Sequence, residues 1–218
     1  MAKSQSTEDY IKGIYKLQQP GKGVSTSELA KHLNIGDGSV TGMLKRLSAK
    51  KLIRYTPYKG VFLAEPGRKL ALRMIRRHRL WEMFLVKHLS YRWDEIHDEA
   101  ERLEHVTSDE MERRLDRVLG YPKVDPHGEP IPTAAGEMEV LGGTPLSDAL
   151  AGETLLLVRV ADDAGLLQHA SAVGLTLGTR FSVKRKLGLD GSMLLAIGAG
   201  EQYVSREIAA SIFVERVA

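Results

Sequence analysis

Apolar side chains recur at helical spacing through the first fifty residues. One stripe predicts a first helix that is capped by Thr7 and ends near Leu17. The stripe consists of Tyr10, Ile11, Ile14 and Leu17. Ser25 and Glu28 have capping-box spacing and open a short helix. After a turn at residues 34–36, Asp37 is expected to cap a third helix. That helix carries an inward stripe of Val40, Met43, Leu44 and Leu47. Two short helices joined by a three-residue turn predict a helix-turn-helix unit.

The pattern then becomes extended. Residues 53–55 and 61–63 alternate as strands around a basic, aromatic tip that contains Tyr58 and Lys59, which predicts a small hairpin. A long apolar helix follows from about 66 to 89. A second helix is expected from 93 or 94 to 106, and a third, capped by Ser108, to about 119.

The composition of the chain changes after residue 120. Residues 121–152 hold most of the prolines and many glycines and are interpreted as a linker. Beyond them, short apolar and alternating segments predict strands at 155–160, 179–186, 193–197, 202–205 and 211–217. A helix capped by Asp162 or Asp163 is expected to interrupt them. The fold class is mainly α with a small β part, divided as 1–73, 74–125, 126–152 and 153–218.

Composition and charge exclude some kinds of site and favour others. The absence of cysteine excludes disulfides and thiolate metal sites. No apolar run approaches the ~20 residues of a membrane helix, and the N-terminus lacks an apolar signal core, so a cytoplasmic location is expected. Residues 1–73 carry 14 Lys and Arg against 5 Asp and Glu, whereas the rest of the chain is mildly acidic. This asymmetry favours a phosphate-binding face, although a solvated basic surface stays possible.

The helix-turn-helix and hairpin offer candidate contacts to double-stranded DNA. Short polar groups near the start of the second helix of the helix-turn-helix, which begins near Asp37, can approach base edges, and cations beside them can pair with phosphates. The first helix of the helix-turn-helix, which begins near Ser25, presents unpaired N–H groups at its N-terminus, and these suit a phosphate. The candidates are Ser25, Thr26, Ser27, Ser39, Thr41, Lys45, Arg46 and Lys59.

Candidate metal ligands gather in the middle of the chain. On a helix, residues three and four apart share a face, so a His/Glu face forms there. It contains His97, Glu101, Glu104 and His105, while His78 and Glu82 form a similar pair in the preceding helix. Such oxygen and imidazole ligands suit Mn²⁺ or Fe²⁺, and also Zn²⁺, Co²⁺ or Ni²⁺. A solvated, salt-bridged helix face is the alternative.

No catalytic motif emerges from the sequence. A di-iron carboxylate enzyme needs Glu three residues before a histidine, and Arg102 stands there before His105. The HExxH pattern and a glycine-rich phosphate loop are also missing. An enzyme is therefore not expected.

The whole chain resembles the diphtheria-toxin-repressor family of metal-dependent regulators. The segments that carry the resemblance are residues 10–15, 28–47, 77–82, 97–100, 104–110 and 126–132. The resemblance implies a winged helix-turn-helix, a helical dimerisation and metal-binding domain, and a C-terminal SH3-like (FeoA-like) domain. It also implies homodimers that bind palindromic operators.

The resemblance further implies two metal sites. The primary site would use Asp9, Glu101, Glu104 and His105. The ancillary site would use His78, Glu82 and His97. A group from the C-terminal domain would close it, with Asp163 as the first candidate and Gln168 or His169 as further ones.

The identity of the ligands bears on the metal. Iron-sensing members place Met and Cys where this chain has Asp9 and Glu101, so the change toward oxygen resembles the manganese branch. Lys12 stands where short manganese sensors have Glu, which argues against their two-metal cluster. We therefore expect a repressor of manganese or iron homeostasis, with Mn²⁺ as the first candidate effector and Fe²⁺ as the second. A winged-helix regulator that responds to a non-metal ligand or partner is the alternative, and a chelator separates the two.

Overall fold

The computed structural model describes residues 2–56, 59–140 and 142–217. By their contacts the residues form two compact units. The first contains residues 1–78, 102–109 and 132–138, and the second contains 79–101, 110–131 and 139–218. Among the described residues, no helix combines the length and the apolar character needed to span a membrane. Tyr58, expected at the tip of the hairpin, lies outside the described residues.

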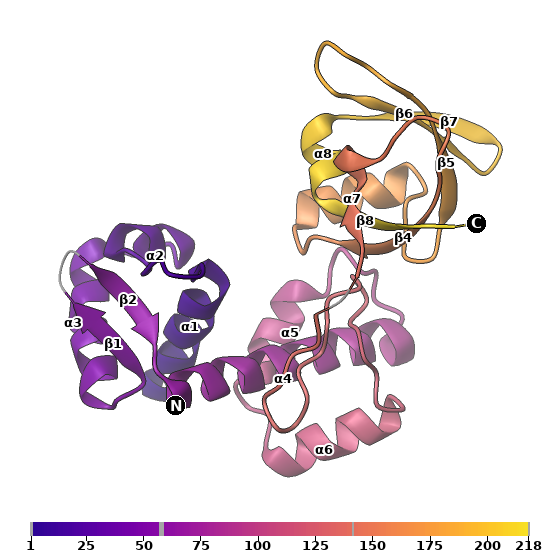
Figure 1. Ribbon diagram of the computed structural model, residues 1–218. Coiled ribbons are helices and arrows are strands. Elements are labelled where there is room, and N and C mark those ends of the chain that lie inside the picture. Colours follow the sequence, from indigo (N-terminus) through magenta and orange to yellow (C-terminus); the bar gives the residue numbers. More distant parts are fainter. Residues whose placement is uncertain (1, 57–58, 141, 218) are drawn as a thin grey trace. The chain divides into compact units, whose positions relative to one another are not determined.

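The first unit contains the predicted winged helix-turn-helix. Its helices are α1 (Ala2–Leu17), α2 (Thr26–His32) and α3 (Asp37–Ala49), followed by strands β1 (Ile53–Thr56) and β2 (Gly60–Leu63). The strands pair antiparallel with Ile53 opposite Leu63, and they form the hairpin beside α3 in Figure 1.

Burial of one face of each helix holds this unit together. Ile11, Ile14 and Leu44 are fully buried in one core with the hairpin residue Val61. Each such aliphatic side chain contributes about 1.5–3 kcal/mol when fully buried. The apolar stripes that predicted these helices are therefore the packed faces.

Local caps define the helix ends. The capping box of α2 is confirmed, because Glu28 N–H donates to Ser25 Oγ (3.1 Å) and Ser25 N–H donates to Glu28 Oε2 (2.8 Å). The expected cap of α3 at Asp37 is wrong, because the extended residue Gly36 occupies the N-cap position and Asp37 is already helical. The expected cap of the first helix at Thr7 is also wrong, because α1 begins at Ala2 and Thr7 lies within it.

Three helices form the middle of the chain. They are α4 (Glu65–Leu89), which contributes to both units, α5 (His97–Glu104) and α6 (Asp109–Val118). In the second unit, Leu80 and Met83 of α4 pack with Leu115 and Leu119 of the α6 region. Helix α5 begins later than expected, because residues 93–95 form a turn and Trp93 packs against the C-terminal core.

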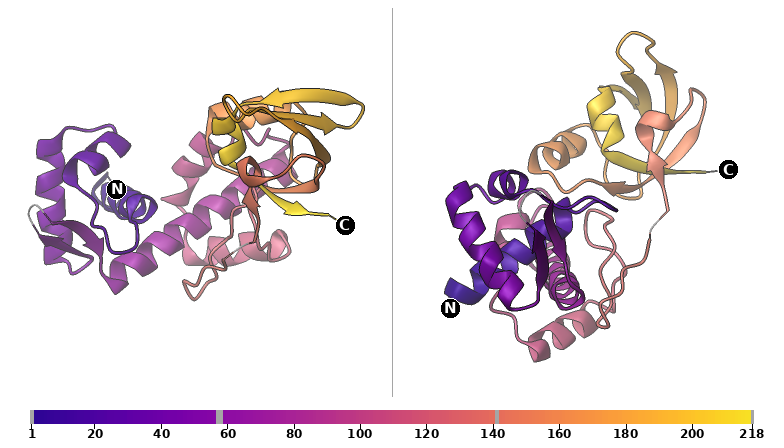
Figure 2. Two further views of the ribbon diagram at one scale, coloured as in Figure 1. Left: turned by 45° about the horizontal axis from the view of Figure 1, so that its top comes forward. Right: turned by 60° about the vertical axis from the view of Figure 1, so that its left-hand side comes forward.

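The C-terminal part of the second unit is a curved antiparallel sheet (Figure 2). Its strands are β3 (Thr144–Pro145), β4 (Thr154–Val160), β5 (Arg180–Lys186), β6 (Met193–Ile197), β7 (Gly200–Val204) and β8 (Ile212–Arg216). They lie in the order β3-β8-β4-β5-β6-β7. Two helices accompany the sheet, α7 (Ala164–Ala172) and α8 (Arg206–Ala210), together with a 3₁₀ turn (Leu146–Asp148). The small β part is confirmed, while β3 and α8 were not predicted.

Candidate metal centres

The first unit brings acidic and imidazole side chains together at a place we call the α1 cluster. It is defined by Glu8, Asp9 and Lys12 of α1, His78 of α4, and Glu104 and His105 at the end of α5. Helix α1 presents Glu8 and Asp9 at this cluster as partly exposed side chains, while Tyr10 and Ile11 of the same helix turn into the core. The cluster therefore adjoins the core of the winged helix.

His105 lies between two carboxylates of α1. Its Nδ1 is 2.8 Å from Glu8 Oε2, and its Nε2 is 2.9 Å from Asp9 Oδ1 and 3.6 Å from Glu104 Oε1. Burial alone would lower the pKa of His105. The hydrogen bonds to Asp9 and Glu8 and the negative charges of Glu104 and Asp9 outweigh it and raise the pKa to about 9. A carboxylate on one ring nitrogen leaves the other for a metal, which is the usual arrangement of a metal-bound histidine.

Glu104 is the buried centre of the α1 cluster. Its side chain is fully buried, and both oxygens have partners. Lys12 Nζ donates to Oε1 at 2.6 Å, and His78 Nδ1 lies 2.5 Å from Oε2. Lys12 thus supplies a positive charge where several ligands for a cation converge.

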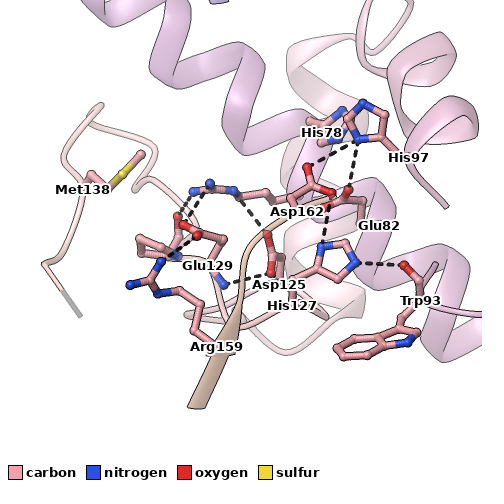
Figure 3. A network of polar contacts seen from close by, with 12 residues as sticks. His78, Glu82, Trp93, His97, Asp125, His127, Glu129, Met138, Arg159 and Asp162 are labelled. Atoms are coloured by element: carbon pink, nitrogen blue, oxygen red, sulfur yellow. Dashed lines mark hydrogen bonds and ion pairs between the residues drawn. The ribbon is translucent and has the colours of Figure 1, made fainter. Parts of the chain in front are cut away.

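A second group lies within the second unit, and we call it the loop cluster. It consists of Glu82 on α4, Asp125 and His127 in the segment after α6, and the flanking residues His97 and Asp162. One ligand atom each from Glu82, Asp125 and His127 lies within 4.8 Å of the others, and all three side chains are buried. Figure 3 shows these side chains pointing toward one another.

The hydrogen bonds of His127 fix its tautomer. Nε2 lies 2.8 Å from the carbonyl oxygen of Trp93, and a carbonyl only accepts, so Nε2 carries the proton. In the neutral ring, Nδ1 then keeps its lone pair. Nδ1 is buried, has no hydrogen bond to any residue that the structure describes, and lies 3.8 Å from Asp162 Oδ1. A buried lone pair that faces carboxylates fits a metal ligand.

Asp125 faces the same point from the other side. Burial and the neighbouring Glu82 carboxylate raise its pKa to about 7, although Arg79 and His127 oppose the shift. Its Oδ1 accepts the backbone N–H groups of His127 (2.8 Å) and Glu129 (2.9 Å). Crowded carboxylates of this kind are stabilised by a bound divalent cation.

Residues expected for the ancillary site come together in the structure, while the carboxylate that accompanies them differs from the expected one. Glu82 and His97 do come together, with Oε1 and Nδ1 3.9 Å apart. The carboxylate beside His97 belongs to Asp162 (3.4 Å) rather than to the expected Asp163. Asp163 instead caps α7 by accepting the N–H of Leu166 at 2.9 Å.

Two further residues bear on the primary site. His78, expected in the ancillary site, contacts Glu104 of the α1 cluster and lies one helical turn before Glu82 on α4. Glu101 precedes Glu104 by three residues on α5 and shares its helix face. The membership of Glu101 in the primary site stays a prediction.

Sequence reasoning missed four residues of these clusters: Glu8, Asp125, His127 and Asp162. The segment 125–132 was assigned to the linker region, yet it is ordered by the backbone hydrogen bonds Asp125 N to Glu129 O and Ile131 N to Lys123 O, both 2.9 Å. A histidine between Pro126 and Gly128 was the available signal.

The candidate DNA contacts lie on the surface of the winged helix. Ser39, Lys45 and Arg46 are exposed on α3, opposite its buried stripe, while Thr41 is half-buried and donates to Asp37 O at 3.3 Å. The others are Ser25, Thr26 and Ser27 at the start of α2 and Lys59 in the hairpin. Ser25 uses its side chain as the helix cap, so its hydroxyl is already engaged.

Comparison with known proteins assigns domains to most of the chain. Residues 3–61 match the N-terminal DNA-binding domain of iron-dependent repressors, and residues 64–133 match their metal-binding and dimerisation domain. The chain belongs to the iron-dependent repressor family. Residues 144–216 match the FeoA domain, which agrees with the FeoA-like domain that the resemblance implied. The protein is therefore a metal-dependent transcriptional regulator with a DNA-binding domain and a dimerisation domain.

The similar proteins differ in the metal that their names give. The chain is 31% identical to the iron-dependent repressor IdeR of Mycobacterium tuberculosis over 97% of both chains. It is 31% identical to the diphtheria toxin repressor of Corynebacterium efficiens over 84% of both. Among solved structures, a manganese-dependent transcriptional repressor in complex with manganese is 34% identical, with a TM-score of 0.86 over 97% of this chain and 100% of that one. ScaR with bound Zn²⁺ is 36% identical, with a TM-score of 0.80 over 97% and 99%.

Proposed function

We propose that this protein is a cytoplasmic homodimeric repressor that binds a palindromic operator when Mn²⁺ is available, with Fe²⁺ as the second candidate effector. The observation that carries the choice of metal is the ligand chemistry. The candidate ligands in both clusters are carboxylate oxygens and imidazole nitrogens, and the chain has no cysteine. Such ligands suit Mn²⁺, whereas thiolates would favour softer metals.

The loop cluster would hold one ion through Glu82, Asp125 and His127, with Asp162 beside them. Its support is the Nδ1 lone pair of His127, held toward the carboxylates by the hydrogen bond on Nε2. The α1 cluster would hold a second ion through Asp9, Glu104 and His105, with Glu101 as a further proposed ligand. A bound ion would add positive charge to that of Lys12 beside Glu104 and of Arg79 beside Asp125.

The α1 cluster is placed to influence DNA binding. Asp9 belongs to α1, whose Ile11 and Ile14 pack in the same core as Leu44 of α3. A cation shared by Asp9, Glu104 and His105 would tie α1 to the 102–109 segment. Metal would then favour one arrangement of the DNA-binding unit by population shift.

Operator binding under defined metal tests the proposal. Duplexes would be selected from a random pool in Mn²⁺ and then titrated by fluorescence anisotropy in Mn²⁺, in anaerobic Fe²⁺ and in EDTA. We expect tight binding with Mn²⁺ and loss of binding in EDTA. His105→Ala should abolish the metal dependence, whereas His88→Ala, which changes an exposed histidine of α4, should not. Equal binding in EDTA would contradict metal activation and favour a regulator of another ligand.

The loop cluster needs its own experiment. His127→Ala should remove one Mn²⁺ per chain in an isothermal titration, and His88→Ala should remove none. If His127→Ala keeps the full metal content, the loop cluster is not a metal site.

A further inference from the structure

A row of charged side chains joins the C-terminal sheet to the loop cluster within the second unit (Figure 3). Arg159 on β4 donates from Nη1 to Glu129 Oε1 at 3.0 Å. The other oxygen of Glu129 lies 3.4 Å from Arg79 Nη2, and Arg79 Nε lies 3.3 Å from Asp125 Oδ2. The row therefore ends on a carboxylate of the loop cluster.

We propose that Arg159 and Glu129 are positioning residues for the metal of the loop cluster. Among the described residues, neither belongs to a group of candidate metal ligands, yet both hold the segment that carries Asp125 and His127. This inference rests on the proposed metal function and adds a second role for the FeoA domain. The domain would supply Asp162 beside the ion and would also fix the place of the ligands from the neighbouring loop.

The backbone of Glu129 forms hydrogen bonds with Asp125, a proposed metal ligand. Its N–H donates to Asp125 Oδ1 at 2.9 Å, and its carbonyl accepts the N–H of Asp125 at 2.9 Å. These bonds close a short loop in which the backbone of His127 also donates to Asp125. Any movement of Glu129 is therefore passed to the carboxylate of Asp125.

Strand β4 touches the same loop directly. Val160 N–H donates to the carbonyl of His127 at 2.9 Å. Gly128 has a φ of +86°, and a Cβ there would lie 2.1 Å from the carbonyl oxygen of Val158. Arg159 stands between these two strand residues, so the side chain that holds Glu129 comes from the place where the backbones meet.

Further contacts restrain the side chains of this charged row. The guanidinium of Arg159 lies over the ring of Phe213, 3.3 Å from its centroid, and Arg159 and Glu129 are each less than a quarter exposed. Arg79 also donates to the carbonyl of Pro130. A partly shielded guanidinium with a stacked face and a carboxylate partner has little freedom to move.

Groups that hold metal ligands in place affect affinity without binding the metal. Removing such a partner typically weakens metal binding 10–100-fold. We expect Arg159→Met and Glu129→Gln each to weaken one Mn²⁺ binding event by about this factor. The double variant should be little worse than the poorer single variant, because both changes break the same contact.

Isothermal titration of the full chain with Mn²⁺ tests this inference. The binding event of the loop cluster is the one that His127→Ala removes. Arg159→Met and Glu129→Gln should weaken that event and leave the other unchanged, and Arg159→Lys should recover part of the loss. The matched control is Arg216→Gln, which breaks an ion pair of the same domain (Arg216 Nε to Glu153 Oε1, 2.8 Å) away from the loop.

The outcomes separate the inference from the proposed function. If His127→Ala removes an event but Arg159→Met and Glu129→Gln keep the wild-type affinity, the positioning role is wrong and the metal site stands. Equal weakening of both binding events would also overturn it, because that indicates a general loss of structure. If His127→Ala removes no event, the metal site itself fails.

Discussion

The buried pair of Lys12 and Glu104 allows a quantitative prediction. The Lys12 side chain is 8% exposed, Glu104 is fully buried, and their charged atoms are 2.6 Å apart. Removing one member of a buried ion pair costs about 3–5 kcal/mol, because the other charge stays buried without its partner. His78 still contacts the second oxygen of Glu104, so we expect Lys12→Met to lose about 3 kcal/mol, the lower end of that range, in metal-free protein.

The assay is urea unfolding followed by circular dichroism, in EDTA and in Mn²⁺. Lys69→Met is the matched control, because Lys69 forms an exposed ion pair with Glu65 at 3.8 Å and should cost at most about 1 kcal/mol. Mn²⁺ at about 100 times its Kd adds roughly 2.7 kcal/mol to any protein that binds it only when folded. Lys12→Met should gain more than the wild type, since the ion replaces the missing charge beside Glu104. The reasoning is refuted if Lys12→Met loses no more than the control in EDTA.

Three further predictions concern pH, DNA and the loop. Because the pKa of His105 is raised to about 9, the protonated side chain stabilises the metal-free protein, fully below about pH 6.5 and no longer once the pH has risen through about 9. Urea titrations at several pH values should therefore show that the difference in unfolding free energy between the wild type and His105→Gln shrinks between about pH 6.5 and about 9. Arg46→Ala should weaken operator binding and reduce the slope of log affinity against log salt by about 1 if Arg46 pairs with a phosphate, and an unchanged slope would exclude that contact. Gly128→Ala should destabilise the chain well beyond Gly136→Ala, because both positions have positive φ but only the first has a backbone oxygen 2.1 Å from the new Cβ; equal melting temperatures would contradict the close contact.

The winged helix could be predicted because its signals are local. The stripe that contains Val40 and Leu44 repeats at helical spacing, and the cap formed by Ser25 and Glu28 needs only a three-residue spacing. The hairpin at β1 and β2 likewise follows from alternation across a short turn. Asp37 shows how far a local signal can locate a helix end. Several neighbouring residues could cap α3, and in the structure Gly36 occupies the N-cap position.

The loop cluster could not be predicted in this way. Asp125 and His127 lie more than forty residues after Glu82, in a proline-rich segment without helical or strand periodicity. Their position depends on backbone bonds to β4, which no local pattern records. The choice between Asp162 and Asp163 has the same origin, since the helix start takes one carboxylate as its cap and leaves the other beside His97.

One linked titration tests the central claim most directly. Mn²⁺ affinity would be measured for the full chain alone and with a saturating selected operator duplex, and operator affinity would be measured with and without Mn²⁺. Reciprocal coupling requires that the duplex raise Mn²⁺ affinity by the same factor by which Mn²⁺ raises operator affinity. The two factors are compared for the same number of bound Mn²⁺ ions. We predict equal factors well above one, which His105→Ala reduces to one. Operator affinity that is the same in Mn²⁺ and in EDTA would contradict the account.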